Sequence, residues 1–317
     1  MGVFEQLATF IERIPGLLLD SGELGIIYAI MALGVFISFR TLNTPDLTVD
    51  GSFALGAAFS AVLAVNGHPV FGLIIAFLAG SAAGCITSLI NVRMGINPLL
   101  ASILVMLGLY SVNLRVMGKQ PNIPINKPAE TIYSLFKADS LAEYGELVLS
   151  IIILSAILIS LYLFLKTRFG FVLRATGDNE NMVRASGVNT DITKLIGLAL
   201  ANGLTALSGG MIAQFQRFSD VQMGTGMVVI GLSSVIIGEV VFGTRPLFRR
   251  LIAVVLGSVL YRFIISIAYE VGLEASDLKL VSAVIVGIAL SAPKIGGGLA
   301  KLKSRFSTGE KAGEQDA

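Results

Sequence analysis

The sequence predicts an all-α polytopic membrane protein with about nine transmembrane helices. The 317 residues are 54% apolar and only 14% charged. A soluble chain of this size carries about a quarter charged residues. Apolar runs of about 18–22 residues recur along the chain, and a helix of that length crosses a bilayer. Between the runs lie polar connections that contain most of the lysines and arginines.

Residues 1–22 precede the first apolar run and carry acidic and basic residues at helical spacing among apolar ones. This pattern is typical of an amphipathic helix that lies in the membrane interface, and it lacks the features of a cleavable signal peptide. Residues 23–293 form the predicted transmembrane domain. Residues 294–317 are rich in glycine and lysine, and we expect a flexible cytoplasmic tail there.

The predicted spans are separated by short turns or by longer polar breaks. In the third span, the small residues of Gly80–Gly84 indicate a face on which another helix can pack closely. The spans are expected at about Leu24–Phe39, Phe53–Val65, Val70–Asn91, Pro98–Val116, Leu147–Leu165, Ile192–Gln214, Met227–Phe242, Leu251–Tyr269 and Leu280–Ala292.

The loop 166–194, between the fifth and sixth spans, is strongly polar with a cationic excess. Such loops stay in the cytoplasm. Asp178 or Asn179 can cap the start of a short helix and Gly187 can end it, which predicts a helix over about Asn179–Ser186. This helix is interpreted either as a docking element or as a solvated connector.

Placing this loop in the cytoplasm orients the other spans. Fifteen lysines and arginines then fall on the inner side and six on the outer side, with two inside spans. This bias supports nine spans with an external N-terminus and an internal C-terminus.

Two segments resemble each other and have opposite topology. PDLTVDGSFALGAAFSAV follows the first span and SDVQMGTGMVVIGLSSVI follows the sixth, and each is an acidic break, then glycine, then a helix of small residues. The first four and last four spans are therefore predicted to be inverted repeats joined by the fifth, with a solute path at the repeat interface. The alternative is a chance recurrence of glycine-rich and alanine-rich helix starts.

Arg262 lies within the eighth span and would cost at least roughly 2.5–3.5 kcal/mol if it faced lipid. We expect it to pair with an acidic residue, Glu239 being the obvious candidate, or with backbone carbonyls. Contact with an anionic group of the solute and snorkelling without function are the other interpretations. The candidate path or gate residues are Asn43, Asp46, Asp50, Asn202, Glu239 and Arg262.

Sequence motifs for catalysis are missing. Gly118-Lys119 lacks the remainder of a phosphate-binding loop, His68 is the single histidine, and Cys85 is the single cysteine. We therefore expect no enzymatic activity, no metal, no cofactor held by this chain, and no nucleic-acid partner.

Three motifs in order, FRTLNTPDLTVDGSFALGAA, RATGDNENMVRASGV and SSVIIGEVVFG, closely resemble a family of bacterial ABC-importer permeases. The family is that of the branched-chain amino acid and ribose permeases, in the subgroup often linked to tryptophan or tyrosine uptake. The resemblance covers about residues 23–293. The segment of residues 1–22 is longer than the segment that precedes the first span in the family. Its role is therefore left open.

The resemblance implies a type II-like importer permease in the bacterial inner membrane. The chain would form a homodimer in membrane lipid around a central pathway, with ATPase subunits inside, where ATP is used, and a solute-binding protein outside. The central loop would carry the coupling helix that faces the ATPase. The residues implied in this coupling are Arg174, Asp178, Asn179, Arg184 and Gly187.

Two other classes of function compete with this one. A secondary transporter driven by an ion gradient usually needs carboxylates inside the membrane, and only Glu239 falls within a predicted span, with Asp46 and Asp50 near a boundary. The third class is a scaffold or receptor subunit that transports nothing. The solute itself is not identified by the sequence.

Overall fold

The computed structural model describes residues 3–126, 129–135 and 144–270, together with residues 272, 273, 277, 280–284 and 287. Seven of the described helices are long and apolar enough to cross a bilayer, and one further apolar helix is shorter. The predicted all-α membrane fold is confirmed. The count of about nine spans is not, because the ninth predicted span and the tail lie largely or wholly outside the described residues.

The elements follow the predicted spans closely, and the fourth and seventh have the predicted bounds. In chain order they are α1 (Val3–Val35), the π-helix η1 (Phe36–Thr41), α2 (Thr48–Val65), α3 (Pro69–Arg93), α4 (Pro98–Val116), β1 (Asn122–Pro124), α5 (Ile132–Leu135), α6 (Gly145–Lys166), α7 (Arg168–Asp178), α8 (Glu180–Ala185), α9 (Thr190–Gln216), β2 (Phe218–Asp220), α10 (Met227–Phe242) and α11 (Leu247–Glu270).

Three helix starts differ from the prediction by more than two residues, and one helix of the central loop was missed. Helix α1 runs without a break from Val3, so no helix end separates residues 1–22 from the first span. Helix α2 begins at Thr48 instead of Phe53, which places Asp50 in its first turn. Helix α11 begins earlier, at Leu247. Helix α7, inside the central loop, was not predicted at all.

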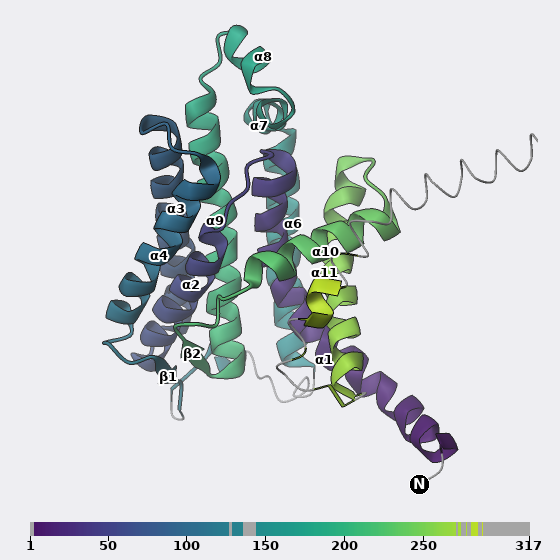
Figure 1. Cartoon of the computed structure of the whole chain (residues 1–317). Coiled ribbons are helices and arrows are strands. Elements are labelled where there is room, and N and C mark those ends of the chain that lie inside the picture. The colour runs from purple at the N-terminus through teal and green to yellow at the C-terminus, as the bar shows by residue number, and fades with distance from the viewer. Residues whose placement is uncertain are drawn as a thin grey trace, which may run out of the picture.

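Helix α9 lies at the centre of the molecule, packed against α1, α2 and α3. A Cβ atom at Gly80 would lie 2.4 Å from the carbonyl oxygen of Asn202, and one at Gly84 would lie 2.2 Å from that of Leu198. Only glycine permits so close a contact between two helix backbones, and the predicted small-residue face of α3 is therefore confirmed. Helices α10 and α11 pack together beside α1 (Figure 1).

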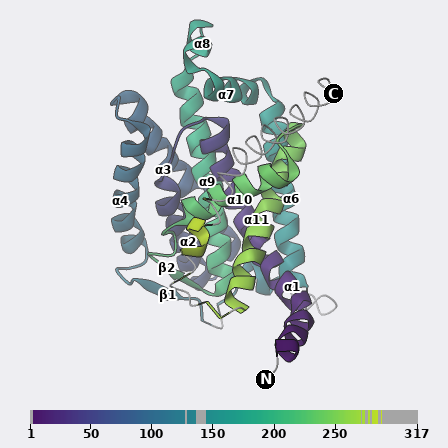
Figure 2. The same cartoon turned by 45° about the vertical axis from the view of Figure 1, so that its right-hand side comes forward.

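The two ends of the molecule carry different structures (Figures 1 and 2). Helices α7 and α8 lie at one end, and the start of α1 and the antiparallel β1–β2 ribbon lie at the other. The charge distribution predicts that the α8 end is cytoplasmic. The chain reaches α2 from the α8 end and reaches α10 from the β2 end, so these two helices begin inside the protein.

Candidate functional site

The starts of α2 and α10 meet through Asp50. Its carboxylate, in the first turn of α2, accepts hydrogen bonds from the backbone N–H groups of Gly226 (2.9 Å) and Val228 (2.8 Å). The carboxylate thus caps the N-terminus of a helix in the other predicted repeat, where negative charge is stabilised.

The backbone geometry explains the glycines before α10. Gly226 has φ +87°, a left-handed conformation that favours glycine. A Cβ atom at Gly224 would lie 2.0 Å from the carbonyl oxygen of Asp50. The two segments that the sequence identified as corresponding breaks are therefore in direct contact. Their relation as inverted repeats stays a prediction.

A buried polar cluster joins α9 to the segment before α2. Asp46 is 1% exposed and accepts hydrogen bonds from the Asn202 side-chain amide (2.6 Å) and the Thr48 backbone N–H (2.9 Å). The Asn202 carbonyl oxygen accepts from the Ser52 hydroxyl (2.7 Å). Because each buried polar group is satisfied, this cluster fixes α2 on α9. Asn43, by contrast, is exposed and has a positive φ of 51°.

Glu239 is held near the C-terminal end of α10 by two arginines. Its carboxylate lies 2.5 Å from the guanidinium of Arg40, in η1, and 2.7 Å from that of Arg250, in α11. The Glu239 side chain is 5% exposed and that of Arg40 is 45% exposed, so the pair lies where the protein interior meets solvent. Arg250 also lies over the ring of Phe36.

The expectation that Glu239 pairs with Arg262 is wrong. The guanidinium carbon of Arg262 lies instead 3.7 Å from the ring centroid of Tyr28, on α1. The aromatic face stabilises the cation where water is scarce. The sequence could not reveal this pairing, because Tyr28 and Arg262 are far apart in the chain and aromatic residues are common in spans.

The predicted short helix of the central loop is confirmed as α8. The Asn179 side chain accepts a hydrogen bond from the backbone N–H of Met182 (3.0 Å), and Gly187 follows the helix with φ +82°. Asn179 is therefore the N-cap, and Asp178 is the exposed last residue of α7.

Salt bridges attach α8 to the start of α9. The Lys194 ammonium lies 2.7 Å from Glu180, and the Arg184 guanidinium lies 2.9 Å from both Asp191 and the Thr190 hydroxyl. Burial raises the pKa of Glu180, but the hydrogen bond and charge of Lys194, then the charge of Arg184, outweigh it and leave the pKa below its ordinary value.

Helix α7 lies against η1. A Cβ atom at Gly177 would lie within 1.9 Å of the carbonyl oxygen of Thr41, the last residue of η1. Leu173 is fully buried and packs in the hydrophobic core with Leu42. Arg174 is half-buried over Phe171 of its own helix, and its Nε donates a hydrogen bond to the Gly170 carbonyl oxygen (3.4 Å).

The structure thus brings together Asp50 with α10, and Asp46 with Asn202, while Glu239 and Arg262 lie in separate clusters. The sequence did not identify several partners: Ser52, Tyr28, Arg40, Glu180, Lys194 and Arg250. From the sequence, Arg40 and Arg250 were counted only as inner-side charges. Their positions beside the ends of spans could have indicated them as partners for Glu239. Among the described residues, no group of three or more His, Cys, Asp or Glu side chains could hold a metal ion.

Comparison with known proteins agrees with this architecture. The family described as "Branched-chain amino acid transport system / permease component" matches residues 18–291. A tyrosine transport system permease protein of Clostridioides difficile (strain R20291) is 40% identical over 262 residues, 82% of this chain and 86% of that protein. An uncharacterised protein of Rickettsia prowazekii (strain Madrid E) is 34% identical over 88% of this chain and 98% of its own.

A ribose import permease of Escherichia coli (strain K12) is 24% identical over 83% of this chain and 80% of its own. No solved structure matches the chain. The matched family and the tyrosine and ribose relatives are transport permease components and not enzymes. The chain therefore belongs to the family of permease components of branched-chain amino acid transport systems and is the transmembrane permease subunit of an ABC importer for a small organic solute.

Proposed function

We propose that two copies of this multi-pass protein of the bacterial inner membrane form the permease of an amino acid importer. The solute class that we favour is an aromatic amino acid. The tyrosine permease relative supports this solute class. The family implies an ATPase and a solute-binding protein as partners in general. In our proposal, ATP is used by the separate ATPase subunits, and this chain holds no cofactor.

The observation that carries the proposal is the attachment of α8 to α9. Helix α8 projects at the cytoplasmic end (Figure 1), and Met182 on it is 60% exposed. The Glu180–Lys194 and Arg184–Asp191 ion pairs keep α8 from moving independently of α9. A helix that is exposed and also attached to the central span has the properties of a docking element for a motor subunit.

Packed contacts lead from α7 and α8 to both broken helices. Helix α9 carries Asn202, which bonds Asp46 before α2. Helix α7 contacts η1, whose Arg40 bonds Glu239 of α10. Coupling between distant sites travels through such packed contacts. A displacement of α7 and α8 by the ATPase would thereby act on the two helices that begin inside the protein.

The same contacts argue against a transporter driven by an ion gradient. Such a protein needs a carboxylate that can exchange a proton or sodium ion. The three carboxylates that the sequence singled out each have strong protein partners: Asp46 has an amide and a backbone N–H, Asp50 has two backbone N–H groups, and Glu239 has two arginines.

Uptake by proteoliposomes tests the proposal. The chain is reconstituted with its ATPase and binding protein, and labelled tyrosine is supplied outside. We expect accumulation with ATP in the lumen and none with an imposed proton or sodium gradient alone. Gradient-driven uptake without ATP would replace the proposal with a secondary transporter. The mass of the permease purified without its partners should correspond to a homodimer.

A further inference from the structure

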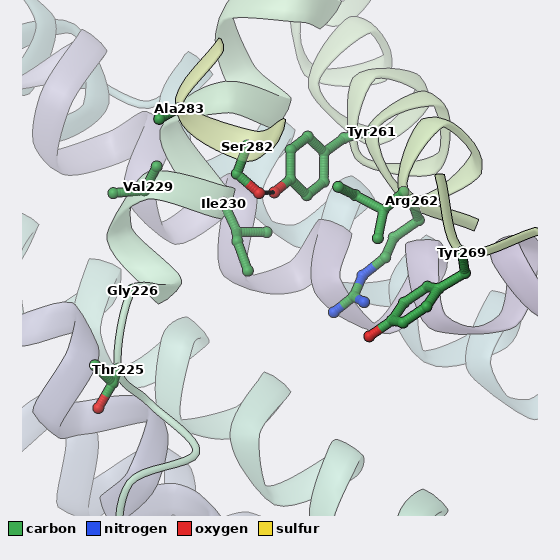
Figure 3. Close-up of a pocket in the computed structure, with 10 residues that line it drawn as sticks. Thr225, Gly226, Val229, Ile230, Tyr261, Arg262, Tyr269, Ser282 and Ala283 are labelled. Atoms are coloured by element: carbon green, nitrogen blue, oxygen red, sulfur yellow. Dashed lines mark hydrogen bonds between the residues drawn. The ribbon is translucent and has the colours of Figure 1, made fainter. Parts of the chain in front are cut away.

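A cavity of about 400 Å³ lies between α10, α11 and residues 282–283, and Arg262 is the one charged side chain among the described residues that line it. Figure 3 shows the guanidinium extending from α11 toward the segment where α10 begins. Most of the wall is apolar, including Val229, Ile230 and Ile265. The size and the single charge in an apolar wall are typical of a site for a small molecule.

Arg262 retains binding capacity in this position. Its guanidinium carbon lies 3.7 Å from the centroid of the Tyr28 ring, and no salt bridge joins Arg262 to a described acidic residue. The Nε atom is buried and has no hydrogen-bond partner among the described residues. The terminal N–H groups of a guanidinium form a planar fork that matches the two oxygens of a carboxylate.

The cavity lies in the outer half of the protein. Arg262 is about 22 Å along α11 from Leu247 and about 12 Å from Glu270, at roughly 1.5 Å per residue. Glu270 is at the end of α11 that lies on the β2 side. The cavity also touches Thr225 and Gly226, immediately before α10. A solute arriving from outside would therefore meet this cavity before it reached the cytoplasmic end.

We propose that this cavity binds the carboxylate of the transported amino acid through Arg262 while the apolar wall accommodates the side chain. This inference rests on the proposed function and adds the chemical group that the permease recognises. A lipid phosphate presents the same anionic chemistry. The mostly apolar wall and the size of the cavity favour the amino acid, and the experiment separates the two.

The chain contains no tryptophan, so the fluorescence of added L-tryptophan reports its binding without background from indoles of this chain. The full-length permease in lipid nanodiscs is titrated with L-tryptophan, with indole-3-propionate, which keeps the carboxylate, and with tryptamine, which lacks it. We expect the two carboxylates to bind roughly ten to a hundred times more tightly than tryptamine, since a charged hydrogen-bonding group is lost. Equal binding of all three would overturn the proposal.

Variants assign the effect to Arg262. Arg262→Leu should bind tryptophan and tryptamine equally, and Arg262→Lys should keep part of the preference because it keeps the charge but loses the fork. Arg115→Leu is the control, because Arg115 is an exposed arginine in the last turn of α4. It should behave as the wild type. An unchanged preference in Arg262→Leu would overturn the proposal.

Two further arms keep the test decisive. If Arg262→Leu does not fold, Val229→Phe narrows the cavity and leaves Arg262 in place; weaker tryptophan binding supports the proposal and unchanged binding overturns it. If Arg262→Leu instead loses co-purified phosphatidylglycerol and keeps its preference for tryptophan, the anion is a lipid. ATP-driven tyrosine uptake by the wild type is measured in parallel, so that failure of the proposed function is distinguished from failure of this site.

Discussion

Replacing Asp50 by asparagine tests whether the start of α10 depends on a carboxylate supplied by α2. The aspartate accepts two backbone hydrogen bonds, at 2.9 and 2.8 Å, from Gly226 and Val228. Asparagine keeps one acceptor oxygen, so one charge-assisted bond and the charge at the helix N-terminus are lost. We expect the free energy of unfolding to fall by about 2–4 kcal/mol.

The assay measures the thermal midpoint of unfolding of the purified protein. A fluorogenic maleimide reacts with the single cysteine, Cys85, as the helices separate, and its fluorescence follows unfolding. Unfolding in detergent is compared at one heating rate. The control is Asp220→Asn. The Asp220 carboxylate accepts a hydrogen bond from the exposed backbone N–H of Gln222, only two residues away, and so joins no separate helices. A midpoint reduction in Asp50→Asn no larger than in Asp220→Asn would refute the capping argument.

Glu239→Gln removes the carboxylate that two arginines share. We expect the free energy of unfolding to fall by about 1–3 kcal/mol, less than for a fully buried ion pair because both arginines reach solvent. The same thermal assay measures this loss. The lowered pKa of Glu180 means that the attachment of α8 is fully present above the ordinary pKa and is lost as pH falls through the folded-state value. Hydrogen exchange should therefore show α8 unchanged from about pH 8 to about pH 5 and loosened only at a pH below the ordinary glutamate pKa, and Lys194→Ala should move that loosening to higher pH. Cysteines at Gly67 and Asn181 should react with an impermeant thiol reagent from opposite sides of the membrane, and labelling from one side would contradict the orientation.

The local features of the fold could be predicted from the sequence because each has a local cause. Asn179 and Gly187 mark the two ends of α8, and the start of α4 follows from Asn97 and Pro98, which cap and start the helix. Helix α7 was missed because its apolar residues lie inside a loop whose overall polarity dominated the interpretation.

The connections within the candidate site could not be predicted, because they join residues that are distant in the chain. The sequence identified the break that contains Asp50 and the break before α10 as equivalent features. Nothing local indicates that the Asp50 carboxylate caps α10. The same holds for Asn202 with Asp46. Charge alone suggested Glu239 for Arg262, whereas packing places Tyr28 there.

Capture of the ATPase subunit tests most directly the central claim that α8 is the docking helix of an importer. The affinity-tagged chain, extracted from its native membrane, should bring an ATPase subunit with it. Met182→Glu places a charge on the exposed surface of α8 without removing a salt bridge, and should reduce the captured ATPase at least about tenfold. Met94→Glu, at a 71% exposed residue that follows α3 at the same end, should not. Equal capture by Met182→Glu and Met94→Glu, or no ATPase with the wild type, would contradict the claim.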